Sequence, residues 1–338
     1  MPKKRVTLTD IANRVGVSQG LVSLALSDSD LVNENTRAEI ILAALEMGYD
    51  LNKRKIRNTR EKIFSLVVSD MSYVNTFFWT EVIVSMENTL AKEKIGLDLV
   101  VYNEQMGTDR LLLELVDKKT SGLITIASCT RKRAGILAQS GLPMVVVDGD
   151  FYCGTECDSI SASNYFSSYS TARYLIGKGH RRLAFVGSIS MAVSFQQRRD
   201  GFSAGATSKK GVTFYDVSGD GGKDFPTFSK DQLLEIMKGE NPPTAIFCAN
   251  DFTAVAVFDL LKEMDLHVPE DVSLVGFDDI VLDHELIPML TTNHVDRAEM
   301  GKMAVELLND RIQHPEQPRR HLELCAPLIE RNSVKKLN

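Results

Sequence analysis

Polar residues follow several apolar runs of this 338-residue chain, where they could bind a small polar molecule. Asp148 follows the run MVVV, Asn250 follows AIFCA, and Asp278 follows SLVGF. A carboxylate in such a place can accept two hydroxyl hydrogen bonds from a sugar. Acids after a strand can equally cap the next helix, and Asp251 fits that role as well as it fits ligand binding. The pattern predicts a binding site built on strand ends.

Short apolar runs alternate with amphipathic segments from residue 63 onward. This alternation is typical of parallel sheets with helices on both faces. Because the carboxyl ends of parallel strands meet at one edge, a ligand would bind outside that edge. Two such series predict two Rossmann-like subdomains. The expected strands cover 63–69, 97–102, 123–127, 144–147, 183–186, 212–217, 245–248 and 272–277, and helices cover 77–94, 164–178 and 251–265 and begin near 108, 131, 195 and 230.

The chain begins differently, with the run TLTDIANRVGVSQGLVSLALS from Thr7 to Ser27. Thr7 can cap a helix, and Asp10 stands three positions later in the capping-box position. Gly16 supplies the positive φ that ends this helix, and Ser18 can cap the next. This is the spacing of a helix-turn-helix, whose second helix reaches base edges in the major groove. An ordinary helical hairpin is the alternative.

A third helix is expected from an Asn33 cap to about Glu46, and the basic run KRKIRNTREK follows it. Residues 1–60 hold ten Lys and Arg against seven Asp and Glu, whereas the whole chain has a net charge of −6. A basic end on an acidic body indicates phosphate contact confined to that end. A solvated linker is the alternative, and it is compatible with DNA contact.

The chain resembles the LacI/GalR family of bacterial transcription regulators over nearly its whole length. The resemblance rests on TLTDIANRVGVSQGLVSLAL, VNENTRAEIILAALEMGY, NTFFWTEV, LIGKGHRRLAFVG, RRDGF, AIFCAND, and VPEDVSLVGFDD followed by PMLTTN. It implies an N-terminal all-α helix-turn-helix head and an α/β body of two Rossmann-like subdomains, of the periplasmic-binding-protein type I. The head and short basic hinge are expected over 1–58 and the body over 63–338, with an N-subdomain of about 63–162 and 292–325 and a C-subdomain of about 163–291 and 326–338.

The resemblance also implies an effector site between the subdomains. The family commonly binds its effector through the Asp that here is Asp278 and through an arginine that matches Arg198. An arginine fork opposite a carboxylate suits a polyol or ribose. Phe77 and Phe78 match the family's aromatic pair, of which one is expected in the core. The expected effector-binding residues are Phe77, Phe78, Asp148, Asn164, Arg198, Asn250 and Asp278, whereas His180 matches a structural position.

Two departures from the family affect the expected DNA contacts. Gly20 has no side chain and Leu24 stands where the family often has arginine, which leaves Gln19 and Ser23 as the main base readers. The segment YDLNKRKIRN lacks the family's proline, and Ile56 is its one substitute for the residue that wedges into the minor groove. The expected DNA-binding residues are Thr7, Ser18, Gln19, Gly20, Ser23, Leu24, Asn33, Thr36, Arg37, Asn52, Lys53, Lys55 and Ile56.

Other motifs argue against an enzyme. No GxGxxG opens a helix after a strand, no GxSxG nucleophile elbow follows a strand, and HExxH does not occur. The five cysteines form no CxxC pair, so reduced thiols are expected, with no metal and no cofactor. The function expected from the sequence is a DNA-binding regulator, by default a repressor, controlled by a sugar or sugar derivative. A purine- or nucleoside-responsive or co-repressor-dependent regulator is the alternative, followed by a sugar-binding protein without a regulatory role.

The expected partners follow from the same features. One helix-turn-helix reads a half-site, so a homodimer on near-palindromic double-stranded operator DNA is expected. The N-terminus MPKKRVTLTD lacks the apolar core of a secretion signal, and no apolar run reaches about 18 residues, the length of a membrane span. A periplasmic binding protein would need such a signal. A cytoplasmic protein without membrane contact is therefore expected.

Overall fold

The computed structural model describes residues 6–27, 31–49, 62–69, 76–102, 106–126, 131–149, 157–219 and 228–337. By its contacts the chain divides into two compact units. Unit 1 comprises Met1–Val74, Val84–Ser159 and Gly301–His321, and unit 2 comprises Asn75–Ile83, Ile160–Met300 and Leu322–Asn338. Within the described ranges, every helix is too short or too polar to span a lipid bilayer.

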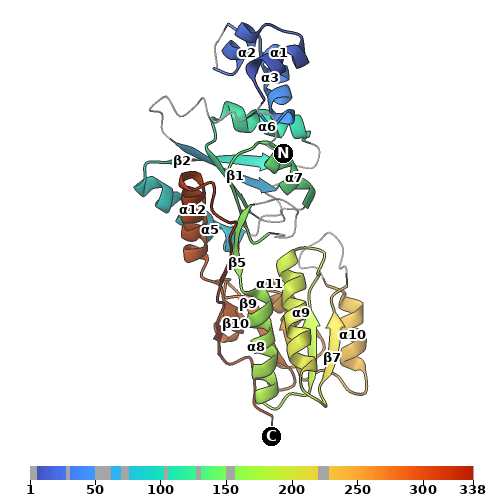
Figure 1. The fold of residues 1–338 in the computed structure, drawn as a ribbon. Coiled ribbons are helices and arrows are strands. Elements are labelled where there is room, and N and C mark those ends of the chain that lie inside the picture. The colour runs from blue at the N-terminus through green and yellow to red at the C-terminus, as the bar shows by residue number, and fades with distance from the viewer. Residues whose placement is uncertain are drawn as a thin grey trace. The chain divides into compact units, whose positions relative to one another are not determined.

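The head consists of helices α1 (Leu8–Val15), α2 (Gln19–Ala25) and α3 (Glu34–Glu46) (Figure 1). The expected capping box is present at the start of α1, and Gly16 ends this helix at φ 78°. The three helices enclose a small core because their apolar residues recur on one face of each helix. Its fully or nearly fully buried members include Ile11, Ala12, Val22, Ala25, Ile40 and Ala44.

The first sheet is built on parallel strands in the order β11-β5-β4-β3-β1-β2. Leu66 of β1 lies opposite Leu99 of β2 and Ile124 of β3. Near-continuous burial of the central strands indicates that helices cover both faces. Its strands are β1 (Ile63–Ser69), β2 (Gly96–Tyr102), β3 (Gly122–Ile126), β4 (Met144–Val147), β5 (Asp158–Ala162) and β11 (His321–Leu324), accompanied by helices α5 (Thr76–Lys92), α6 (Thr108–Asp117), α7 (Arg131–Gln139) and α12 (Arg297–Gln313).

The second sheet repeats this arrangement in the order β12-β10-β9-β8-β6-β7, with only β12 antiparallel to its neighbour. Helices α8 and α9 lie side by side in Figure 1. Its strands are β6 (Arg182–Val186), β7 (Thr213–Val217), β8 (Ala245–Cys248), β9 (Ser273–Asp278), β10 (Thr291–His294) and β12 (Leu328–Ile329), and its helices are α8 (Asn164–Gly177), α9 (Val193–Thr207), α10 (Lys230–Lys238), α11 (Asp251–Glu263) and the short 3₁₀ turn η2 (Ile287–Met289).

The structure confirms the predicted fold class, a helical head followed by two α/β sheets. All eight expected strands are present, with ends that differ by one residue at most. The sequence did not predict β5, β10 or α12, although α12 is 17 residues long.

Helices α8 and α9 approach each other at a glycine of α9. A Cβ placed on Gly205 would lie 2.6 Å from the Tyr169 carbonyl oxygen and 2.8 Å from the Ala172 Cβ. Backbone cannot move aside as a side chain can, so Gly205→Ala should lower the free energy of unfolding by about 1–2 kcal/mol. Urea unfolding measures this change.

Gly135→Ala is the matched control, because Gly135 also lies in a helix and a Cβ there would meet nothing within 4 Å. This variant should gain up to about 1 kcal/mol from helix propensity. Equal gains in both variants would contradict the close packing of α8 on α9.

Candidate functional site

The start of α2 presents an exposed surface in the head. Ser18 caps this helix, and its Oγ accepts from the Leu21 N–H at 3.1 Å. Gln19 and Gly20 are exposed, Ser23 is half-buried, and Leu24 is 39% exposed. These residues occupy the turns of a second helix that reads base edges in helix-turn-helix proteins. Their contact with DNA stays a prediction.

The other predicted DNA-binding residues of the head have mixed positions. Thr7 caps α1 and its hydroxyl donates to Asp10 Oδ2 at 2.6 Å. Asn33 caps α3 as expected, and its Oδ1 accepts from the Asn35 N–H at 2.9 Å. Both caps lie at helix N-termini, where backbone N–H groups favour phosphate. Thr36 and Arg37 are half-buried on α3, whereas Asn52, Lys53, Lys55 and Ile56 lie outside the described residues.

In unit 2, the Arg198 side chain of α9 contacts two predicted effector-binding residues and the residue before a third. Its Nη1 lies 3.1 Å from Asp278 Oδ1, and both side chains are at most 5% exposed. Nε donates to Asn164 Oδ1 at 2.8 Å, and Nη1 also donates to the Ala249 carbonyl oxygen at 2.8 Å. Ala249 directly precedes Asn250, another of the predicted effector-binding residues. The fold therefore brings together Asn164, Arg198 and Asp278 from α8, α9 and β9. Their binding of an effector stays a prediction.

Aromatic rings support the same guanidinium. The Arg198 Cζ lies 3.8 Å from the centre of the Phe277 ring and 5.5 Å from that of Phe195. A guanidinium stacked on a ring face is held in one plane and interacts with the ring quadrupole. Its Nε donates to Asn164 and its Nη1 faces Asp278 at the same time. The result is a rigid group of fixed donors and acceptors.

The backbone at the end of β9 is unusual. Asp278 has φ 109° and Asp279 has φ 55°, a left-handed region that residues with a Cβ rarely adopt. Such conformations persist where surrounding contacts hold them, and they cluster at functional sites. The Asp279 carboxylate is held by Arg331 Nη2 at 2.7 Å and His294 Nδ1 at 2.9 Å. Burial would raise the pKa of Asp279, but these hydrogen bonds outweigh burial and lower it.

The two polar residues after β8 have different tasks. Asn250 caps α11, because its Oδ1 accepts from the Thr253 N–H at 2.9 Å and from its hydroxyl at 2.8 Å. Asp251 is not the cap. Its Oδ2 accepts from the Ile280 N–H at 2.9 Å, and its Oδ1 accepts from the Thr292 hydroxyl at 2.6 Å. Asp251 therefore ties the segments after β9 and within β10 to α11.

Burial, together with the nearby charge of Asp278, raises the pKa of Asp251 to about 8. An Asp carboxyl in an unfolded chain titrates near pH ~3.9. Because the folded chain holds this proton more tightly, the contribution to stability is complete below about pH 4 and is lost as the pH rises toward about 8. Asparagine mimics the protonated acid, since its carbonyl can accept from Ile280 and its amide can donate to the Thr292 hydroxyl oxygen.

Between pH 6 and 8, the chain should therefore lose up to about 1.4 kcal/mol of stability per pH unit relative to Asp251→Asn. Urea unfolding of both proteins at pH 6, 7 and 8 measures the difference. Asp271→Asn is the control, because the pKa of the exposed Asp271 is lowered, mainly by the His267 N–H, and its charge does not change in this range. Parallel stability curves for the chain and Asp251→Asn would contradict a retained proton.

Three further predicted residues lie elsewhere or serve the core. Phe78 is 5% exposed and meets Trp79 edge to face at 5.0 Å, so it is the core member of the aromatic pair. Phe77 is 56% exposed, with its ring centre 5.9 Å from that of Phe252. Asp148 follows β4 in unit 1 with φ 50°. The ligand roles of these residues stay predictions.

The environment of His180 agrees with the structural role that the sequence suggested. This residue is fully buried, with Nδ1 2.9 Å from Thr244 Oγ1 and Nε2 3.1 Å from the Lys335 carbonyl oxygen. Burial lowers its pKa, which favours a neutral ring. Within the described residues, no three His, Cys, Asp or Glu side chains are grouped as metal ligands. Cys157, Cys248 and Cys325 are not joined in disulfides, and Cys129 and Cys153 lie outside the described ranges.

Sequence reasoning missed several residues around Arg198. Gln197 Oε1 accepts from Asn164 Nδ2 at 3.1 Å, and Phe277 stacks on Arg198. Arg297 donates to the carbonyl oxygen of Asp278 at 2.5 Å. Phe277 could have been suspected as the neighbour of Asp278. No sequence signal distinguishes Gln197 or Arg297 from other polar residues on helices.

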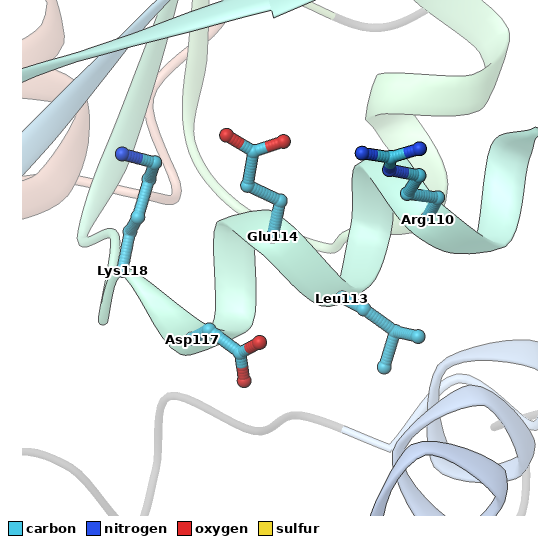
Figure 2. A pocket seen from close by; sticks show the side chains of 5 residues that line it. All are labelled: Arg110, Leu113, Glu114, Asp117 and Lys118. Carbon is cyan, nitrogen blue, oxygen red and sulfur yellow. The ribbon is translucent and has the colours of Figure 1, made fainter. Parts of the chain in front are cut away.

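A separate pocket of about 510 Å³ lies beside α6 in unit 1. Figure 2 shows Leu113 and Asp117 pointing to one side of the helix, whereas Arg110, Glu114 and Lys118 point to the other. The two cations are matched by two carboxylates, and the side chains do not converge on one point. The pocket therefore has no arrangement that selects a ligand.

Comparison with protein families gives two matches. Residues 7–52 match the model described as "Bacterial regulatory proteins, lacI family". Residues 172–334 match the "Periplasmic binding protein-like domain". The first match spans the three helices of the head, and the second contains Arg198, Asn250 and Asp278.

Similar proteins cover the full length. A protein of Vibrio vulnificus named "HTH-type transcriptional repressor PurR" is 28% identical over 98% of this chain and 99% of its own length. A protein of the same name from Proteus mirabilis is 28% identical over 97% of this chain and 96% of its own length.

Solved structures have the same fold. A LacI family transcriptional regulator from Enterococcus faecalis V583 with bound ribose is 26% identical, with a TM-score of 0.65, over 82% of this chain and all of its own. The complex of the transcriptional regulator CelR with cellobiose has a TM-score of 0.69 at 23% identity, over 97% of this chain and all of its own. The lac repressor dimer bound to operator and the anti-inducer ONPF has a TM-score of 0.66 at 21% identity, over 98% of this chain and all of its own.

Proposed function

We propose that the chain is a repressor of the LacI family that binds operator DNA and is controlled by a small effector, because residues 7–52 match the lacI family model and a repressor named PurR aligns with nearly the whole chain. One observation carries the proposal: a single chain joins a three-helix head with an exposed second helix to a body with a buried Arg198–Asp278 group. The head reads DNA, and the body senses the effector.

The head acts in pairs. A single helix-turn-helix reads one half-site, so two copies of the chain bind a near-palindromic duplex. The lac repressor dimer bound to operator supports this arrangement. An effector changes DNA affinity only when it binds one state of the dimer better than the other. A tenfold change needs about 1.4 kcal/mol of such a difference.

The charges around Asp278 favour an uncharged, hydroxyl-rich effector. Arg198 faces Asp278 at 3.1 Å, Arg297 faces Glu81 at 2.7 Å, and Arg331 faces Asp279 at 2.7 Å. A phosphorylated or carboxylated ligand would have to displace one of these carboxylates to reach a cation. A sugar instead supplies hydroxyls that can donate to Asp278 and accept from Arg198. The ribose and cellobiose complexes of similar proteins support this class.

A purine-responsive repressor is the second candidate. The relatives named PurR, at 28% identity over nearly the whole chain, favour it. The 56% exposed ring of Phe77 could stack on a base. Both candidates act on DNA in the cytoplasm, and both use the group around Arg198 for binding through its paired donors and acceptors.

Two measurements on the purified full chain test the proposal. Selection from random duplex DNA should enrich a near-palindromic sequence that the chain prefers over random competitor at moderate salt. A thermal-shift panel of D-ribose, cellobiose, adenine, guanine and adenosine should identify a ligand that raises the melting temperature. If only the purine compounds of this panel raise the melting temperature, the second candidate is favoured. Failure to prefer any duplex would refute the repressor function.

A further inference from the structure

Arg297 holds the peptide backbone directly behind the Asp278 carboxylate. It is the first residue of α12, and its side chain is 9% exposed. Nη1 donates to the carbonyl oxygen of Asp278 at 2.5 Å, and both Nη atoms lie 3.4 Å from that of Asp279. The left-handed conformation of these two residues costs about 1–3 kcal/mol unless contacts hold it. Arg297 is one of the groups that keep Asp278 directed at Arg198.

The same guanidinium is paired with a residue far away in the chain. Arg297 Nε donates to Glu81 Oε2 at 2.7 Å. Glu81 lies on α5, and its side chain is 49% exposed. A guanidinium presents its donors in one rigid plane. Arg297 therefore cannot shift on the Asp278 carbonyl without also shifting on Glu81.

Helices α5 and α12 belong to both units. Residues 75–83 and those up to Met300 lie in unit 2, whereas Val84 and Gly301 begin stretches of unit 1. Glu81 and Arg297 thus stand in the parts of these two helices that unit 2 contains. Because a helix shifts as a stiff element, a displacement of its first turns is passed along its axis. Arg331 and His294 also hold this region, but they lie in segments assigned to unit 2 alone.

We propose that Arg297 and Glu81 are a positioning pair that couples the Asp278 site to the first turns of α5 and α12. A ligand that engages the Asp278 carboxylate moves the peptide that Arg297 holds, and Arg297 passes the movement to Glu81. Control of DNA affinity by this route rests on the proposed function. The coupling inside unit 2 does not.

Amide hydrogen exchange of the full-length chain, without DNA or ligand, tests the coupling. The reporter is the amide of Ile280, which lies two residues after Asp278 and donates to the Asp251 carboxylate. Glu81→Gln should speed exchange over residues 278–280 about three- to tenfold, as expected for loss of one partly exposed charge-assisted hydrogen bond. In return, Asp278→Asn should speed exchange at residues 81–84. Such reciprocity is a property of coupled sites.

Glu285→Gln is the matched control, because the Glu285 carboxylate pairs with Lys262 at 2.5 Å on the surface of the same unit. This variant should leave exchange at 278–280 unchanged. Equal exchange at these residues in Glu81→Gln and the control would overturn the proposal. A uniform increase over the whole second sheet in Glu81→Gln would overturn it as well, since it indicates general destabilisation. If DNA selection fails instead, the proposed function falls and the exchange result still decides the coupling.

Discussion

Replacing Arg198 with methionine should lower the free energy of unfolding by about 3–5 kcal/mol, because it leaves the Asp278 carboxylate buried without its charge partner. The variant also loses the hydrogen bonds to Asn164 and Ala249 and the stack on Phe277. Urea unfolding at pH 7 measures the change. Adding Asp278→Asn to Arg198→Met should recover part of the loss, because the unpaired charge is then removed.

Arg199→Met is the control for this prediction. Arg199 is the next residue of α9, its Nε lies 3.2 Å from Asp200 Oδ1 and its Nη1 lies 3.7 Å from Asp216 Oδ2, and all three side chains are 27–42% exposed. Removing such surface pairs should cost less than about 1 kcal/mol. If Arg198→Met lowers the free energy of unfolding no more than this control does, the buried pair does not stabilise unit 2.

Replacing Gln19 with alanine should weaken binding to the selected duplex by about 1–3 kcal/mol, a factor of roughly 5 to 150. Gln19 is the first residue of α2, is exposed, and carries the longest polar side chain among the predicted readers of this helix. The loss should be confined to specific binding, because affinity for random duplex comes from phosphate contacts. Competition binding with labelled selected duplex and unlabelled random duplex separates the two affinities.

Gln139→Ala provides the matched comparison, since Gln139 is an exposed glutamine at the end of α7, outside the head. It should leave both affinities unchanged. A Gln19→Ala variant that keeps its preference for the selected duplex would remove Gln19 from the base readers.

Local features of the fold were predictable because their signals lie within a few residues of each other. The caps at Thr7, Ser18 and Asn33 each act on an N–H two or three positions away, and all three are present. The buried strands were equally visible as short apolar runs. By contrast, β5 (DSISA) and β10 (TTNH) are polar in sequence and are buried only because neighbouring elements cover them. Their burial is a tertiary property, so no local pattern predicted it.

The proposed effector site was predicted in part. Its carboxylate could be found at the end of a strand, but Arg198 was assigned through family resemblance, and the pairing of Arg198 with Asp278 joins residues 80 positions apart. Sequence reasoning also left open whether Asp251 caps α11. The structure assigns the cap to Asn250 and directs Asp251 to Ile280 and Thr292.

The amino-acid sequence alone therefore determined the three head helices, the eight apolar strands, the cap that begins α2 and the carboxylates that follow those strands, because near neighbours in the chain control these features. Only the tertiary structure decided which hydrogen-bond partner or cation each buried carboxylate meets, and it placed Arg297 and Glu81 behind Asp278. A buried charge requires a partner at hydrogen-bond distance. In a parallel α/β fold, that partner comes from a different strand or helix, and the order of strands in the sheet selects it.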